Sequence, residues 1–201
     1  MDDINNQVIG IDEVGRGALC GPVVSCSVLL DKSILKYPLV NEINDSKKIN
    51  ETKRKVLSDF IKKFSIFSFG IADNQEIDKI NILKATILSM NRSFHKFKDY
   101  ENIIKIDGQK TFELNENTFF IIKGDQKSVS IAAASILAKN YRDSLMKKMS
   151  KTFPEYEWEK NKGYGTKSHT NAIKKFGITP LHRESFLKKL NFGHRQLDRH
   201  L

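Results

Sequence analysis

The chain has 201 residues and a formal net charge of +10, from 34 Lys and Arg against 24 Asp and Glu. This length can bury a hydrophobic core without disulfides or a structural metal. No apolar run approaches the ~20 residues of a membrane span, residues 1–7 do not resemble a signal peptide, and two cysteines match no zinc or redox spacing. Composition excludes a membrane protein, a secreted scaffold and a zinc finger, and predicts a reduced, cytoplasmic protein.

The first third of the chain alternates short strands with a helix. Residues 8–12 (VIGID) predict a buried strand that leads into a glycine-rich turn, and residues 21–30 predict a second strand rich in β-branched side chains. Helical spacing of apolar residues over 50–64 predicts a helix with Asn50 as its N-cap. Residues 64–72 alternate apolar and small side chains, which indicates a third strand.

The middle of the chain continues this alternation. Apolar positions from Ile77 to Phe97 recur at helical spacing and predict a long amphipathic helix. Residues 102–107 and 119–123 are short apolar runs ending near Asp or Gly, which is typical of strands. An alanine-rich helix is predicted over residues 130–149.

The order of these elements predicts the fold class. Three early strands, followed by strands that alternate with helices, are typical of an α/β protein with a mixed sheet flanked by helices. Neither a linker nor a repeat interrupts the chain, so we expect a single domain over residues 1–201. Its basic last part, from about residue 160 to 201, is expected to form a helical appendage.

Acidic residues stand at the ends of predicted strands. Asp12 and Glu13 close the first strand, Asp107 closes a later one, and glycine follows closely in both places. Carboxylates at strand ends can converge at one edge of a sheet. Solvated turn residues would produce the same local pattern, so this interpretation stands beside the functional one.

A fourth acid, Asp143, lies on the alanine-rich helix. At ~100° per residue it shares one face with Ser135, Lys139 and Arg142. This stripe could present an acid to a metal and a lysine to a phosphate, whereas the simpler alternative is a surface pair between Lys139 and Asp143.

The acids indicate the chemistry. Carboxylates without nearby His or Cys clusters favour Mg²⁺ or Mn²⁺ over zinc. Three or four of them around two such ions, ~3.5–4 Å apart, hydrolyse phosphodiesters by activating a water and stabilising the leaving oxygen. A basic surface around an acidic centre would hold a phosphate backbone. The residues alone therefore predict metal-dependent phosphotransfer, with a nuclease as one form of it.

Six segments together resemble bacterial ribonuclease HII, of the type 2 ribonuclease H family. They occur in family order and span residues 8 to 186, and DEVGRG and KGYGT are highly specific in combination. The segments are IGIDEVGRGALCGP (9–22), NDSKK (44–48), KIDG (105–108), IAAASILAKNYRD (131–143), KGYGT (162–166) and HRESF (182–186). The resemblance implies a ribonuclease H-like fold with a C-terminal helical segment.

The resemblance also implies an activity and its cofactors. The enzyme would be an endonuclease that cuts the RNA strand of RNA–DNA hybrids and cuts 5′ to single ribonucleotides in duplex DNA. Two Mg²⁺ or Mn²⁺ ions would assist an in-line water attack that leaves 5′-phosphate and 3′-hydroxyl ends. Carried over by position, the catalytic and metal-binding residues are Asp12, Glu13, Asp107 and Asp143.

Substrate contacts follow from the same resemblance. The turn Gly15-Arg16-Gly17 corresponds to the loop that reads the ribose 2′-hydroxyl, and Tyr164 to a tyrosine that packs on the junction nucleotide. Glycine suits such reading because no Cβ keeps the backbone away from the sugar. The expected substrate-binding residues are Gly15, Arg16, Gly17, Lys47, Ser135, Lys139 and Tyr164. For His169 and His182, which lack ligand spacing, we expect structural or backbone-contacting roles.

Small departures and alternatives complete the prediction. Ala18 stands where proline is common and Glu184 where a basic residue is usual, and neither position is an acid. A ribonuclease HIII-like enzyme would carry a further N-terminal domain and a GKG loop, whereas here seven residues precede the first strand and Arg16 occupies the turn. A non-catalytic nucleic-acid-binding protein on this fold would be expected to lack an acid, and all four are present. We expect a monomer.

Overall fold

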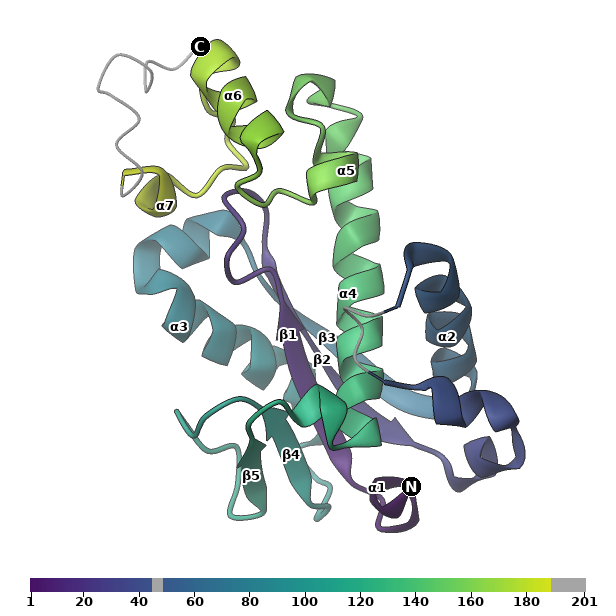
Figure 1. Cartoon of the computed structure of the whole chain (residues 1–201). Coiled ribbons are helices and arrows are strands. Elements are labelled where there is room, and N and C mark those ends of the chain that lie inside the picture. Colours follow the sequence, from purple (N-terminus) through teal and green to yellow (C-terminus); the bar gives the residue numbers. More distant parts are fainter. Residues whose placement is uncertain (45–48, 189–201) are drawn as a thin grey trace.

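The structure, a computed structural model, describes residues 1–44 and 49–188. Its centre is a five-stranded sheet in the order β3-β2-β1-β4-β5 (Figure 1). The strands β1, β2 and β3 pair antiparallel, whereas β4 and β5 extend the sheet parallel to β1. The predicted mixed sheet is therefore confirmed. The strands are β1 (Ile9–Val14), β2 (Val23–Leu30), β3 (Ser65–Ala72), β4 (Ile104–Asp107) and β5 (Thr118–Ile121).

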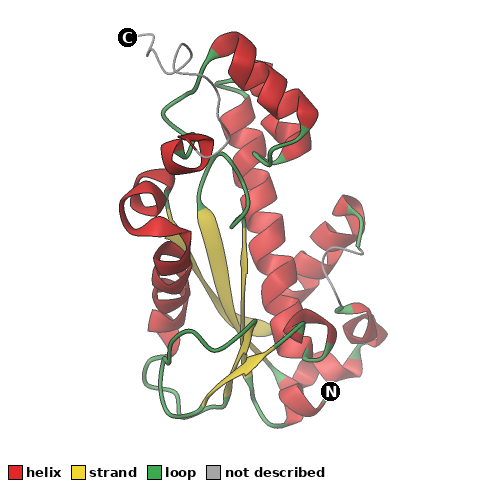
Figure 2. Cartoon of the chain, turned by 60° about the vertical axis from the view of Figure 1, so that its left-hand side comes forward, coloured by secondary structure: helices red, strands yellow, loops and turns green. Residues whose placement is uncertain are grey.

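Helices cover both faces of this sheet, as Figure 2 shows. The helices α4 and α2 pack on one face, and α3 packs on the other. The α-helices are α1 (Asp2–Asn5), α2 (Glu51–Lys63), α3 (Asn74–Phe94), α4 (Val129–Ser150), α5 (Trp158–Asn161), α6 (Lys167–Phe176) and α7 (Glu184–Lys188). Short 3-10 helices are η1 (Lys32–Lys36), η2 (Pro38–Glu42), η3 (His95–Phe97), η4 (Gly124–Gln126) and η5 (Pro154–Tyr156).

Close contact between α4 and β1 depends on one glycine. A Cβ on Gly10 would lie 2.1 Å from the carbonyl carbon of Ser130, at the start of α4. The buried alanines that follow in α4 also keep the helix near the sheet. Strand β1, which carries Asp12, therefore lies directly against the helix that carries Asp143.

Of two helix predictions, the N-cap of α2 is confirmed, whereas the single continuous helix predicted from Ile77 contains a bend. Asn50 caps α2 as expected, because its side chain accepts a hydrogen bond from the Lys53 backbone N–H at 2.9 Å. The long helix predicted to begin at Ile77 is instead bent at Asn81, whose φ of 68° and ψ of 164° are not helical. The Asn81 side chain accepts from the Lys84 N–H, so it caps the segment after the bend.

The C-terminal helices form a smaller layer at the far end of α4. Trp158 and Tyr156 stack at 5.2 Å between ring centroids and pack with Met146 of α4 and with Leu19 and Cys20 of the β1–β2 connection. Short helices joined by loops thus make up residues 154–188, while the predicted continuation to 201 lies outside the described residues.

Two predicted exclusions concern cysteines and membranes. Cys20 and Cys26 are both buried free thiols. Among residues 1–44 and 49–188, the structure contains no helix with the length and apolarity that a membrane span requires.

Candidate active site

Three of the predicted acids meet at one edge of the sheet. Asp12 and Glu13 lie near the end of β1, and Asp107 is the last residue of β4. These strands run parallel, and Ile11 pairs with Ile106. Asp12 and Asp107 each follow that pair by one residue, so they lie at the same level on neighbouring strands. Fold topology therefore brings together acids that are separated by almost a hundred residues in the sequence.

The electrostatics of this edge are unfavourable to negative charge. Burial raises the pKa of Asp12 well above its ordinary value, and the charges of Glu13 and Asp107 add to that effect. Burial also raises the pKa of Glu13, although the nearby Arg16 guanidinium opposes this. A cation bound among these carboxylates would relieve their repulsion.

Each carboxylate also has a protein partner. Asp12 Oδ1 accepts from the Glu13 N–H at 2.7 Å, and the Ser135 side chain hydrogen-bonds to Asp12. Asp107 Oδ1 accepts from the Gly124 N–H at 2.6 Å, and Glu13 Oε1 pairs with Arg16 Nη1 at 3.2 Å.

With the side chains in this arrangement, no three His, Cys, Asp or Glu in the described parts of the chain stand at metal-binding spacing. The donor chemistry nevertheless fits Mg²⁺ or Mn²⁺, which prefer carboxylate oxygens. The charge repulsion within the group supports the same fit.

Asp143 has a different environment. One of its oxygens accepts from Arg54 Nη1 at 3.0 Å, and the other contacts Lys139 Nζ at 2.8 Å. The Lys139–Asp143 pair is the one expected under the simpler alternative, yet Asp143 is only 4% exposed and not a surface residue. Asp143 is thus a buried acid neutralised by two basic side chains.

Arg54 is a residue of this site that the sequence analysis missed. It comes from α2 and is buried, although arginine is rarely buried without a partner. A signal was present, because Arg54 precedes Leu57 and Ile61 at helical spacing and therefore shares their apolar face.

Two buried arginines hold the backbone that follows β1. Arg183 donates to the carbonyl oxygens of Arg16 and Gly21, each at 2.9 Å. Arg142 donates to those of Pro22, Cys20 and Lys162 at 2.8, 3.0 and 2.8 Å. Neither arginine forms an ion pair with another described residue. Arg183 therefore holds the Gly15-Arg16-Gly17 turn, here called the first turn, and Arg142 holds the backbone that follows it.

The environment of Arg142 corrects part of the helix prediction. The periodicity placed Arg142 on the polar stripe with Asp143, but its side chain is fully buried and binds backbone carbonyls. Gly15, with a φ of 95°, leaves the space for it, since a Cβ there would lie 2.2 Å from Arg142 Nε. Burial lowers the pKa of Arg142, and burial together with the Arg142 charge lowers that of Arg183 to about 9.

Tyr164 lies beside the first turn. Its backbone forms a bridge with Ala18, and the Leu19 N–H donates to the Gly163 carbonyl at 2.8 Å. The expected exposed ring is instead half-buried, with Lys139 Nζ 5.8 Å and Arg142 Cζ 5.5 Å from its centroid. The turn Gly163-Tyr164-Gly165, here called the second turn, therefore packs against the first.

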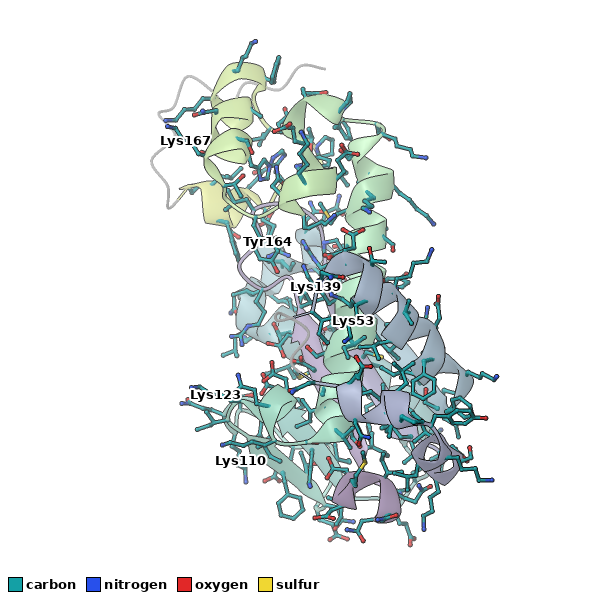
Figure 3. The ribbon with its side chains drawn as sticks, turned by 45° about the vertical axis from the view of Figure 1, so that its right-hand side comes forward. Lys53, Lys110, Lys123, Lys139, Tyr164 and Lys167 are labelled. Carbon is teal, nitrogen blue, oxygen red and sulfur yellow. The ribbon has the colours of Figure 1, made fainter. Side chains whose placement is uncertain are left out.

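The remaining predicted substrate residues have separate positions. Ser135 is buried and contacts Asp12, and Lys47 lies outside the described residues. Figure 3 shows Lys139 and Tyr164 close together between the C-terminal helices and the sheet, with Lys123 on one side and Lys167 on the other. Basic side chains thus flank the site at both ends.

A cavity of about 310 Å³ adjoins the acids. Its polar end is formed by Glu13, Arg16 and Asp107, and its apolar wall includes Leu83 and Met90 of α3. No pattern in the sequence indicated that α3 borders this cavity.

Comparisons with known proteins agree over most of the chain. The family profile described as ribonuclease HII matches residues 9–191. Ribonuclease HII of Caldanaerobacter subterraneus subsp. tengcongensis is 46% identical over 189 residues, which cover 94% of this chain and 77% of that protein. Ribonuclease HII of Pelagibacter ubique is 49% identical, over 88% of this chain and 94% of that protein.

A solved structure supports the fold. Ribonuclease HII of Archaeoglobus fulgidus, determined in complex with PCNA, superposes with a TM-score of 0.74 at 21% identity, covering 90% of this chain and 94% of that one. At this identity the likeness speaks for the fold alone. The profile match and the bacterial relatives, together with the strand-edge acids and the paired turns, show that this chain belongs to the ribonuclease HII family.

Proposed function

We propose that this ribonuclease H cuts the RNA strand of RNA–DNA hybrids and cuts duplex DNA on the 5′ side of a single embedded ribonucleotide. Family membership makes the chain a divalent-metal-dependent ribonuclease acting on nucleic acid. The observation that carries the finer proposal is the packing of the second turn on the first, next to Asp12, Glu13 and Asp107.

The four acids are proposed to hold the metal ions. Asp12, Glu13, Asp107 and Asp143 supply the oxygen ligands that Mg²⁺ and Mn²⁺ prefer, two ions being used with substrate. Such ions activate a water for in-line attack and stabilise the leaving oxygen, giving 5′-phosphate and 3′-hydroxyl ends. A carboxylate offers about four lone-pair sites, so Asp143 can bind an ion while it keeps a contact to Arg54 or Lys139.

The two turns are proposed to recognise the substrate. An isolated ribonucleotide differs from its DNA neighbours only by the 2′-hydroxyl, which can donate and accept hydrogen bonds. The backbone of the first turn can approach that hydroxyl closely because Gly15 and Gly17 carry no Cβ. Tyr164 would pack against the adjoining sugar. Phosphate groups would be bound by Ser135, by Lys139 and, as its sequence position suggests, by Lys47.

Exposed lysines extend this proposed surface. Lys123 and Lys167 lie on either side of the Lys139–Tyr164 pair in Figure 3. A duplex laid across the site would meet positive charge at both ends, and the acids between them would face the scissile phosphate. A monomer acting in the cytoplasm is the form that we propose for the enzyme.

The test is cleavage of end-labelled duplex DNA that carries one ribonucleotide. We expect a single cut 5′ to the ribonucleotide with Mg²⁺ or Mn²⁺, and none with EDTA or on the all-DNA duplex. A continuous RNA–DNA hybrid, run in parallel, should be cut at many positions. Cleavage of the hybrid without any cut in the single-ribonucleotide duplex would contradict the proposed junction recognition but leave the ribonuclease H activity intact.

A further inference from the structure

Two histidines form a buried chain of hydrogen bonds behind Tyr164. His182 Nδ1 lies 2.9 Å from the Thr179 backbone nitrogen, and the Nε2 atoms of His182 and His169 are 3.1 Å apart. His169 Nε2 also lies 3.0 Å from Trp158 Nε1, and His169 Nδ1 lies 3.0 Å from the Tyr164 carbonyl oxygen. Both histidine side chains are buried, at 0% and 2% exposure.

Fixed groups at the ends of this chain determine where each proton sits. The Thr179 backbone N–H and the Trp158 indole N–H can only donate, so His182 Nδ1 and His169 Nε2 must accept. The Tyr164 carbonyl can only accept, so His169 Nδ1 must carry a proton. His182 therefore donates from Nε2 to His169. Both rings are neutral, and burial lowers the pKa of each, that of His182 to about 3.

The segment that carries His182 also holds the first turn. The backbone of His182 forms a bridge with Cys20, and its neighbour Arg183 donates to the carbonyls of Arg16 and Gly21. The His182 side chain meanwhile reaches the second turn through His169. One short segment thus contacts both turns, through its backbone and Arg183 on one side and through the histidines on the other.

We propose that His169 and His182 are positioning residues, whose hydrogen-bond relay from Thr179 to the Tyr164 carbonyl sets the second turn relative to the first. This rests on the proposed role of the two turns in recognising an embedded ribonucleotide. The relay orients the backbone of Tyr164, while the Tyr164 ring lies against Lys139 and Arg142. A displacement of ~1 Å at such a contact can change a rate by about 10²-fold.

Matched amide substitutions test the relay at His169. In His169→Asn the amide nitrogen falls near the position of Nδ1 and can still donate to the Tyr164 carbonyl. In His169→Gln the amide falls near Nε2 and cannot make that bond. The measured quantity is the cleavage rate on the single-ribonucleotide duplex divided by the rate on the continuous hybrid, with thermal melting recorded for each variant.

We expect His169→Gln, which loses the bond to the Tyr164 carbonyl, to lower this ratio by about 10-fold or more. His169→Asn keeps that bond but loses the link to His182, so its ratio should fall less, to the level of His182→Asn. The same logic applies at His182, where Gln retains a donor toward His169 and Asn retains only the acceptor for Thr179. There we expect Gln to preserve the ratio and Asn to lower it. Equal ratios within both pairs would overturn the relay and leave the histidines as packing residues.

Tyr164→Ala separates this proposal from the one on which it rests. If Tyr164→Ala lowers the ratio and neither His169→Gln nor His182→Asn does, the relay is wrong and the role of Tyr164 stands. If Tyr164→Ala leaves the ratio unchanged, the proposed reading of the junction by the second turn is wrong.

Nitrogen-15 NMR of the wild-type protein tests the relay without any substitution. We expect His169 to be protonated at Nδ1 alone and His182 at Nε2 alone, near neutral pH. A protonated His169 Nε2, or a protonated His182 Nδ1, would contradict the relay whatever the variants do.

Discussion

Asp12 and Asp143 are both buried acids of the predicted site, yet their charges have opposite surroundings. Asp12 lies beside two further carboxylates, and burial and their charge raise its pKa. Asp143 contacts Arg54 and Lys139, which neutralise it within the folded chain. The strand edge therefore accumulates negative charge, whereas the helix carries acid and base together.

This difference indicates which part of the site depends on an added cation. A buried charge is costly unless it is paired, and within residues 1–44 and 49–188 the strand-edge acids have an ion pair with Arg16 alone. Binding of Mg²⁺ or Mn²⁺ would supply the missing charge there. Asp143 already has cationic partners in Arg54 and Lys139, so its charge is balanced without a metal.

The largest effect should come from removing charge at the strand edge. Asp107→Asn changes a proposed metal ligand at nearly constant volume, and we expect cleavage to fall by more than the roughly 10–100-fold typical of losing an outer-shell partner. Binding of the duplex should persist, because the substitution also removes repulsion toward phosphate. The checks are single-turnover cleavage and a binding titration; near wild-type turnover would show that Asp107 is not a ligand.

The next effect concerns the free energy of unfolding measured in EDTA. Replacing Asp143 should lower it, whereas replacing Asp12 should raise it. Asp143→Asn leaves the buried Arg54 without its counter-charge, and we expect a loss of about 3 kcal/mol in the free energy of unfolding. Asp12→Asn relieves like-charge repulsion and should gain on the order of 1 kcal/mol. Urea denaturation measures both, and a destabilising Asp12→Asn would contradict the account of the strand edge.

A smaller effect should appear on adding metal to the substrate-free protein. At a Mg²⁺ or Mn²⁺ concentration tenfold above the dissociation constant, we expect about 1.4 kcal/mol of stabilisation. Thermal melting with and without the ion measures it. In Asp12→Asn the increment should shrink, whereas in Lys96→Met, a change at an exposed lysine that contacts a backbone carbonyl of β3, it should remain.

The last effect is a pH dependence of stability that arises from the histidine relay. The folded state keeps His169 and His182 neutral with a lowered pKa, while the unfolded chain protonates them near 6.5. For His182 the unfolded state thus binds more protons between pH 6.5 and about 3, so stability falls as pH falls, by at most about 1.4 kcal/mol per pH unit. His169 contributes in the same direction below pH 6.5. Above pH 6.5 this contribution is fully present.

Replacing His182 with Gln tests that slope directly. This variant should show a shallower loss of stability between pH 6.5 and 4.5 than the wild-type protein in the same buffers. An unchanged slope would mean that His182 is not held neutral in the folded state. The raised pKa of Asp12 acts in the opposite direction, and making the comparison in an Asp12→Asn background removes that contribution from both proteins.

The sequence determined most of the local structure and the chemistry of the strand edge. Alternation and β-branched residues defined the strands, helical spacing defined α2, and alanine content indicated α4, because these patterns arise from the geometry and propensity of each element itself. Asp12, Glu13 and Asp107 were recognisable because each stands at the end of an apolar strand. The bend at Asn81 escaped prediction, since an asparagine within a helical pattern does not reveal its own φ.

Only the tertiary structure decided which partners these residues meet. Periodicity put Arg142 on the polar face of its helix, but five backbone carbonyls held by Arg142 and Arg183 require residues distant in sequence. The pairing of Asp143 with Arg54, and the contact between turns about 150 residues apart along the chain, have the same origin. Local sequence sets which face of an element is polar or apolar, whereas the packing of several elements decides what that face contacts.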